Sequence, residues 1–302
     1  MKVISFGSIN MDLVVRAPRL PQPGETLLGS RFVAVPGGKG ANQAVAAARL
    51  GVPTHMIGCV GTDAYGQPLI ENLQRSGVQT AGIQAVEGSS GVALITVSEA
   101  GANTIIVVAG ANEAVGEAAL RALETLESGD VLLLQLEIPL PVVVQAAQMG
   151  ARRGAFVILD PAPAQALPPT LYPSITMITP NQSEAEQLVG FAVNTPQDGQ
   201  RAAEQLVSWG VAHAVVKMGG SGAVYASAEA PPLHLPPHEV PVVDTVAAGD
   251  AFNGGTAAGL AQGLPIAEAL RWGMATGALC VTRHGAQEAM PTRDEVIALL
   301  GR

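Results

Sequence analysis

The strongest candidate for chemistry is an acid that follows three small residues at the predicted start of a helix. The segment VDTVAAGDAFNGG, residues 242–254, places Asp250 directly after two alanines and a glycine. We predict a strand at 240–244 and then a helix, whose first amides can bind an anion such as a phosphoryl group. Asp250 could then accept the proton of an attacking hydroxyl. An ordinary acid that stabilises the first turn explains the segment equally well on its own.

Polar side chains also follow two other apolar segments. In GSINMD, Asn10 and Asp12 lie two residues apart in an extended stretch, so they point the same way and could bind vicinal hydroxyls. A polar turn is the alternative. Glu137 ends the apolar run LLLQLE, and because a buried acid needs a partner, it either faces a ligand or is tied to another polar group.

Three further segments suit the approach of a ligand to the backbone. PGGKGANQA, residues 36–44, is a Gly-rich turn that opens a helix, although no Ser or Thr follows Lys39 as in a P-loop. A closely packed turn explains it as well. KMGGSGA, residues 217–223, follows a strand and suits a nucleotide. In TPNQSEAE, Asn181 and Glu184 can cap a helix, which we favour for Glu184.

The elements that must position these residues alternate between strand and helix. We predict apolar strands at 3–9, 54–61, 130–137, 155–162, 175–181 and 213–220, and helices that include 38–51, 64–76, 115–127, 249–263, 266–283 and 293–301. This alternation predicts an α/β fold with a mostly parallel central sheet between two layers of helices. Two strand-rich patches, about 10–35 and 91–108, break the rhythm, and we interpret them as a small antiparallel sheet that covers something.

Composition excludes several classes of protein. The chain has 302 residues, of which 48% are hydrophobic and 14% charged, so it can bury a large core. Its net charge is −9 and it has no basic run, which argues against nucleic acid or an anionic membrane as partner. No stretch of about 18 apolar residues occurs, and the N-terminus is typical of a strand rather than a signal peptide. Cys59 and Cys280 lie in apolar segments, so we expect buried thiols and a cytoplasmic protein.

Taken together, these segments resemble the ribokinase (PfkB) family of carbohydrate and nucleoside kinases. GGKGANQAVAAARLG is similar to the N-terminal signature of the family and DTVAAGDAFNGG to its C-terminal one, in the right order and about 200 residues apart. The resemblance covers essentially the whole chain. It implies one domain over residues 1–302, with a ribokinase-like three-layer sandwich and a small antiparallel β lid from the two patches. It also implies a homodimer formed through the lid.

The activity that the resemblance implies is ATP-dependent phosphorylation of the 5-hydroxyl of D-ribose, with Mg²⁺ and a monovalent cation, usually K⁺. Asp250 matches the catalytic base. The anion hole matches Ala247, Ala248 and Gly249. The sugar site matches Asn10, Asp12, Gly38, Lys39, Asn42 and Glu137. The nucleotide site matches Asn181, Lys217, Gly219, Gly220, Ser221, Gly222, Gly249 and Met274. The cation site matches Asp244, Val246, Cys280, Arg283, Gly285 and Ala289.

Two positions depart from the family pattern, and two other functions stay open. Ala289 stands where the family often has a serine in the cation site, and Met274 lies at a position that often lines the adenine pocket. The acceptor could instead be deoxyribose, fructose, 2-keto-3-deoxygluconate or a nucleoside, although an aromatic content of 3% offers few rings to stack a base. A sugar-binding regulator without catalysis is more remote, because it would not need the acid of AAGD.

Overall fold

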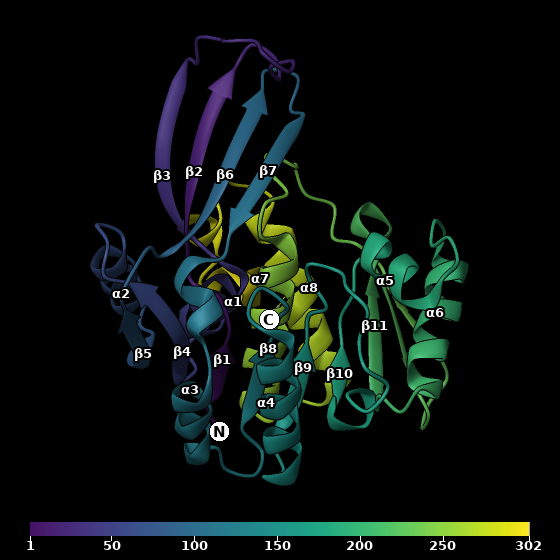
Figure 1. The fold of residues 1–302 in the computed structure, drawn as a ribbon. Coiled ribbons are helices and arrows are strands. Elements are labelled where there is room, and N and C mark those ends of the chain that lie inside the picture. Colours follow the sequence, from purple (N-terminus) through teal and green to yellow (C-terminus); the bar gives the residue numbers. More distant parts are fainter. Residues whose placement is uncertain (302) are drawn as a thin grey trace.

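The fold is built on one large sheet. The protein is seen in a computed structural model that describes residues 1–301 (Figure 1). In this range a nine-stranded sheet has the order β13-β12-β11-β10-β9-β8-β1-β4-β5. Its strands are β1 (Val3–Phe6), β4 (Thr54–Gly61), β5 (Gln79–Val86), β8 (Val131–Leu134), β9 (Phe156–Leu159), β10 (Met177–Ile178), β11 (His213–Lys217), β12 (Ala223–Ser227) and β13 (Leu233–Leu235). From β5 to β11 all neighbours are parallel, and β12 and β13 add antiparallel pairs at one edge.

Helices cover both faces of this sheet, as the alternation predicts. The helices are α1 (Lys39–Arg49), α2 (Gly66–Arg75), α3 (Glu117–Ala122), α4 (Leu140–Arg152), α5 (Gln182–Val189), α6 (Pro196–Ser208), α7 (Ala248–Ala261), α8 (Ile266–Cys280) and α9 (Arg293–Leu299). Successive residues of β1 point to opposite faces of the sheet and show the two layers. Ile4 faces a core with α3, α4, α5 and α6, and Val3 faces a core with α1, α7, α8 and α9. Burial of these apolar side chains provides the main stabilisation.

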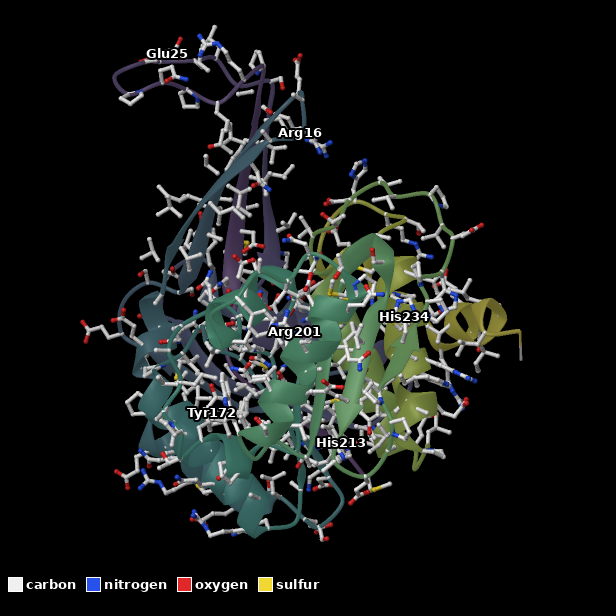
Figure 2. All side chains as sticks on the ribbon, turned by 90° about the vertical axis from the view of Figure 1, so that its right-hand side faces the viewer. Arg16, Glu25, Tyr172, Arg201, His213 and His234 are labelled. Atoms are coloured by element: carbon white, nitrogen blue, oxygen red, sulfur yellow. The ribbon has the colours of Figure 1, made fainter. Side chains whose placement is uncertain are left out.

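A second sheet projects from the main body as a lid (Figures 1 and 2). Its strands, in the order β3-β2-β6-β7, are β2 (Asn10–Ala17), β3 (Arg31–Gly37), β6 (Gly91–Ser98) and β7 (Asn103–Val108). The pairs β2·β3 and β6·β7 are antiparallel, and the central pair β2·β6 is parallel. The central pair is parallel because both strands leave the main body in the same direction.

Three local predictions differ from the structure. Residues 240–244 form no strand; instead the amides of Val243 and Asp244 donate to the carbonyl of Val281, just after α8. β5 was not predicted, because QTAGIQAV lacks a continuous apolar run. The predicted helix 115–127 is broken into α3 and a short 3-10 turn, Leu123–Thr125. None of these differences moves a candidate site residue away from the site.

Candidate active site

The candidate site lies at the edge of the main sheet where the parallel strands end. Ligands bind at this edge in open α/β sheets. The polar residues that follow the strands are Ser8 after β1, Gln135 and Glu137 after β8, Asp160 after β9, Asn181 after β10, and Lys217 at the end of β11. The lid rises above the same edge (Figure 1).

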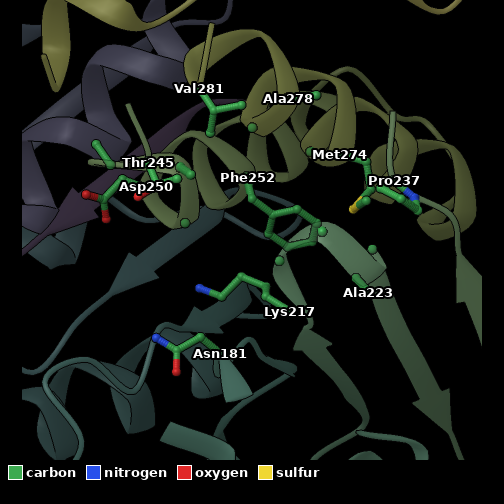
Figure 3. Close-up of a pocket in the computed structure, with 18 of the residues that line it drawn as sticks. Asn181, Lys217, Ala223, Pro237, Thr245, Asp250, Phe252, Met274, Ala278 and Val281 are labelled. Carbon is green, nitrogen blue, oxygen red and sulfur yellow. The ribbon is translucent and has the colours of Figure 1, made fainter. Parts of the chain in front are cut away.

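A cavity of about 720 Å³ opens beside this edge. Asp250 lies at one end of it and Met274 at the other, with Lys217 and Asn181 along one wall (Figure 3). Lys39 and the backbone of 247–249 also line the cavity. Its dimensions and mixed polar and apolar lining suit a small organic ligand.

The turn before Asp250 has a left-handed residue that is not a glycine. Ala247, the N-cap of α7, has φ 58° and ψ 12°, and no other non-glycine residue in 1–301 has a positive φ. Such a conformation costs about 1–2 kcal/mol for an L-residue. Ala247, Ala248 and Gly249 all line the cavity, and the first amides of α7 have no partner within the helix. The amide of Ala248 also donates to the carbonyl of Thr245 at 3.3 Å.

Asp250 is held by two amides of α1. Asn42 Nδ2 donates to Oδ2 at 2.9 Å, and Gln43 Nε2 donates to Oδ1 at 3.0 Å. Burial raises the pKa of Asp250, and the nearby Asp160 adds to the rise, whereas Lys39 and the two amides oppose it. A buried carboxylate with a raised pKa is suited to accept a proton.

Lys39 is the cation at the centre of several acids. Burial alone would lower the pKa of its amine, but the carboxylates of Asp250, Asp160 and Glu137, with that of Glu184, raise the pKa overall. The amine therefore stays charged in a place where an isolated lysine would lose its proton.

The sugar-site residues named from the resemblance lie together beneath the root of the lid. Glu137 is tied to polar groups, because it accepts from Ser8 Oγ at 2.5 Å and from the amide of Lys39 at 3.1 Å. Asn10 Oδ1 accepts from Asn112 Nδ2 at 2.7 Å. Gly38 has φ 88°, and an added Cβ would lie 2.7 Å from the amide nitrogen of Asn10.

Asp12 lies on β2 close to the other acids. Burial raises its pKa to about 7, with contributions from the charges of Glu137 and Asp250, whereas Lys39 lowers it. Asp12 and Asn10 are two residues apart on one strand, as expected from the sequence. The pair therefore lies on a strand and not in a polar turn, and Asp12 is close enough to interact with the charges of Glu137 and Asp250.

The nucleotide-site residues line the other part of the cavity. Asn181 caps α5 in a capping box with Glu184, which confirms the predicted capping role. Lys217 Nζ bonds Asp160 Oδ1 at 3.0 Å. Of the 219–222 turn, the three glycines line the cavity and Ser221 does not. Gly220 has open space around it, so a ligand can approach its backbone.

The six residues of the candidate cation site come from two neighbouring segments and a short turn. Asp244 Oδ2 accepts from the amide of Gly285 at 3.2 Å, and the thiol of Cys280 lies 3.8 Å from the carbonyl of Val246. The side chain of Arg283 pairs with Glu295 instead of turning inward. Ala289 is fully buried near Cys280 in one apolar cluster. Both cysteines are free and buried, as expected.

Sequence reasoning missed several residues of the site. Ser8, Gln43, Gln135 and Asp160 are all buried. Ser8, Gln43 and Asp160 are hydrogen-bonded to the candidate residues Glu137, Asp250 and Lys217, and Gln135 is hydrogen-bonded to Gln43. Their position directly after an apolar strand could have singled out Asp160, Gln135 and Ser8. Gln43 gave no signal, because glutamine is an ordinary helix former in an Ala-rich helix.

An acid in the first turn of a helix, at the carboxyl edge of a parallel sheet, places a base beside an anion-binding turn, which is the arrangement that phosphoryl transfer needs. The chain belongs to the pfkB family of carbohydrate kinases, whose family model matches residues 1–293. Ribokinases from Haemophilus influenzae and Bacillus subtilis are 40% and 41% identical to it over 297 residues, covering 98% of this chain and 97% and 98% of theirs. The structure of Arabidopsis thaliana ribokinase complexed with ribose and ATP is 33% identical, with a TM-score of 0.91 and coverage of 100% of this chain and 99% of that one.

Proposed function

We propose that the protein transfers the γ-phosphoryl group of ATP to the 5-hydroxyl of D-ribose, giving D-ribose 5-phosphate and ADP. The observation that carries the proposal is the place of Asp250. It lies between the cavity, which it lines together with Lys217 and Met274, and the cluster that contains Asn42. A single carboxylate thus faces both the site for the nucleotide and the site for the acceptor.

In this mechanism Asp250 accepts the proton of the attacking hydroxyl. The amides of 247–249 hold the transferred group at the start of α7, and Lys39 supplies positive charge beside it. The sugar is held by Asn10, Asp12, Asn42 and Glu137. Asn42 supports this assignment, because its Oδ1 is buried with no hydrogen-bond partner among residues 1–301 and can accept from a hydroxyl. Positioning and charge stabilisation supply most of the acceleration in such reactions.

Two metal ions complete the proposed site. Within residues 1–301 no group of three or more His, Cys, Asp or Glu could hold a metal. This suits Mg²⁺ bound with ATP, because Mg²⁺ is held mainly by phosphate oxygens and water. The segments 244–246 and 280–285 offer carbonyl oxygens and the carboxylate of Asp244, and carbonyl oxygens can replace the hydration shell of a potassium ion. A cation bound there would neutralise the negative charge of Asp244 and of the carbonyl oxygens, and would add positive potential behind the anion-binding turn.

We also propose that the chain acts as one catalytic domain and forms a homodimer through its lids. β7 is an edge strand, and its residues Ile105, Ile106, Val107 and Val108 are all exposed. An exposed apolar edge strand is unfavourable in an isolated monomer, and a second copy of the lid would cover it. We place the enzyme in the cytoplasm, which its two free, buried cysteines suit. Among residues 1–301, no helix combines the length and apolarity needed to cross a membrane.

The test is an assay of ADP formation with ribose, deoxyribose, fructose, 2-keto-3-deoxygluconate and adenosine as acceptors. We expect the highest kcat/KM with ribose. Asp250→Asn should lower kcat by on the order of 100-fold or more, as for a lost general base, and leave ribose binding nearly unchanged. A higher kcat/KM with another acceptor would change the assigned substrate. Turnover by Asp250→Asn close to that of the wild type would remove Asp250 as the base.

A further inference from the structure

Gln43 lies where the two halves of the site meet. It is fully buried in α1, and its Nε2 donates both to Asp250 Oδ1 and to Asp160 Oδ2, each at 3.0 Å. Its Oε1 accepts from Gln135 Nε2 at 2.8 Å. Both N–H bonds and the carbonyl of this side chain are therefore engaged within the protein.

Only one orientation of this amide satisfies its neighbours. If the amide were reversed, its carbonyl oxygen would face the carboxylates of Asp250 and Asp160, and its NH₂ group would face that of Gln135. Carboxylates accept and do not donate, so all three contacts would become repulsive. The network thus fixes the direction from which Asp250 receives a hydrogen bond.

The neighbouring residue Asn42 binds the other oxygen of Asp250 but has a different role. Its free Oδ1 is available to a ligand, whereas Gln43 has no free donor. Asp160, the second partner of Gln43, pairs with Lys217 at 3.0 Å. The amine of Lys217 would lie only 3.1 Å from a Cβ added at Gly249, so it adjoins the anion-binding turn. Contacts therefore run from this turn through the Lys217–Asp160 pair and Gln43 to Asp250.

We propose that Gln43 is a positioning residue, which orients Asp250 toward the acceptor hydroxyl and couples it to the Asp160–Lys217 pair on the nucleotide side. The inference rests on the proposed role of Asp250 as the base. It extends that role, because it assigns the orientation of the base to a residue that touches neither substrate.

Several charged groups around Asp250 influence its protonation, and Gln43 donates to two of the negative ones, Asp250 itself and Asp160. Lys39 from α1 favours the carboxylate form of Asp250, and Asp160 opposes it. Asp12 on β2 and Cys280 on α8 also interact with the charge of Asp250. The two N–H bonds of Gln43 compensate two like charges at once, since each carboxylate receives one of them.

The main test is Gln43→Met, which keeps the length of the side chain and removes its hydrogen bonds. The rate of phosphoryl transfer is measured in a single turnover with saturating ribose and ATP, over a range of pH. We expect the rate at the optimum to fall roughly tenfold or more, with the KM for ribose changed less than about threefold. The acidic limb of the profile should move up by about one pH unit, because the carboxylate loses a donor.

A second variant should shift the profile in the opposite direction. Asp160→Asn removes the like charge beside Asp250, so the acidic limb should move to lower pH. A merely structural role of Gln43 would lower the melting temperature of Gln43→Met but would not move its acidic limb, and the Asp160→Asn shift shows that the limb reports the charge state of Asp250. Gln287→Met serves as matched control, because it also removes a buried, hydrogen-bonded glutamine. We expect its acidic limb to stay at the wild-type pH.

If Gln43→Met does not fold, Gln43→Asn provides the test, because it keeps a buried amide in α1 but is one methylene shorter, which withdraws the donor from both carboxylates. An upward shift supports the proposal, and an unchanged limb overturns it. The proposed function is checked separately: wild type without ribose-dependent turnover, or an active Asp250→Asn, would refute that function. A wild type and Asp250→Asn that behave as expected, with an unshifted limb in folded Gln43→Met, would refute only the role of Gln43.

Discussion

At the scale of single residues, the site gathers acids around one amine. Asp12, Glu137, Asp160 and Asp250 all interact with the charge of Lys39. Burial of so many like charges is unfavourable for folding, so this arrangement is explained by chemistry and not by stability. Lys39, the pairing of Lys217 with Asp160 and the amides of α1 are what keep the acids compatible with the fold.

Asp12 should make ribose binding depend on pH. Burial raises its pKa to about 7, so the carboxylate form dominates above that pH and is lost as pH falls through it. A charged carboxylate accepts hydrogen bonds from hydroxyls better than the protonated acid does. We expect the Kd of ribose, measured by calorimetry without ATP, to be constant at alkaline pH. Below pH about 7 it should rise by up to roughly tenfold per unit.

Asp12→Asn is the control for this expectation, because its side chain has the same shape and no charge at any pH. Its Kd for ribose should be higher than that of the wild type and nearly independent of pH in the same range. A wild-type Kd that does not change with pH, or a variant with the wild-type slope, would show that another group governs binding.

At the scale of elements, the turn into α1 depends on a glycine that allows a close approach. Gly38 has φ 88°, and an added Cβ would lie 2.7 Å from the amide nitrogen of Asn10. Gly77, after α2, has φ 83° but no atom within 4 Å of such a Cβ. The two positions therefore separate the cost of a left-handed backbone from the cost of a clash.

We expect Gly77→Ala to lower the free energy of unfolding by about 1 kcal/mol with activity unchanged, because only the left-handed conformation is penalised. Gly38→Ala should cost more than about 2 kcal/mol and raise the KM for ribose, since the turn must move away from Asn10. Urea unfolding and steady-state kinetics measure both effects. Equal losses in the two variants would mean that the close approach at Gly38 is unimportant.

Most elements could be predicted from the sequence because their patterns are local. The continuous apolar strands VLLL and FVIL predict a sheet buried on both faces, and that prediction is confirmed. Residues 240–244 were predicted as a strand from their valines, yet Val242 and Val243 are exposed there. The amides of Val243 and Asp244 bond to the carbonyl of Val281, just after α8, and not to a neighbouring strand. The local sequence does not determine which of these partners a backbone amide finds.

The site could be predicted only in part, because its contacts join distant segments. The acid of α7 was recognisable from the small residues before it, and Asn10 and Asp12 from their spacing. The pairing of Asn42 and Gln43 with Asp250 spans more than half of the chain. No local pattern encodes such a contact, so the network behind the carboxylate became visible only in the structure.

At the scale of the whole molecule, the lid projects from the body (Figure 2). The apolar side chains of its outer strand β7 are exposed. In the proposed dimer this strand lies in the interface. Ile106→Lys adds a charge at a residue that is 64% exposed, where edge strands of monomers often carry one.

We expect the wild type to sediment as a dimer and Ile106→Lys as a monomer in analytical ultracentrifugation. The free lid of the monomer should also raise the KM for ribose, because nothing supports it over the sugar. Leu233→Lys, on the distant edge strand β13, is the control and should remain dimeric. A monomeric wild type, or a dimeric Ile106→Lys, would contradict an interface through β7.

The parallel pair at the centre of the lid also determines when the lid can form. Asn10 pairs with Gly91, so β2 has to wait for a partner that is synthesised much later. Closing so long a loop costs conformational entropy, which is recovered only after the intervening strands β4 and β5 have joined the main sheet. During translation the β2–β3 hairpin therefore leaves the ribosome without its neighbour, and the edge of β2 that later pairs with β6 is left unpaired. The nascent chain is most exposed to aggregation, and most in need of a chaperone, in the interval between these two strands.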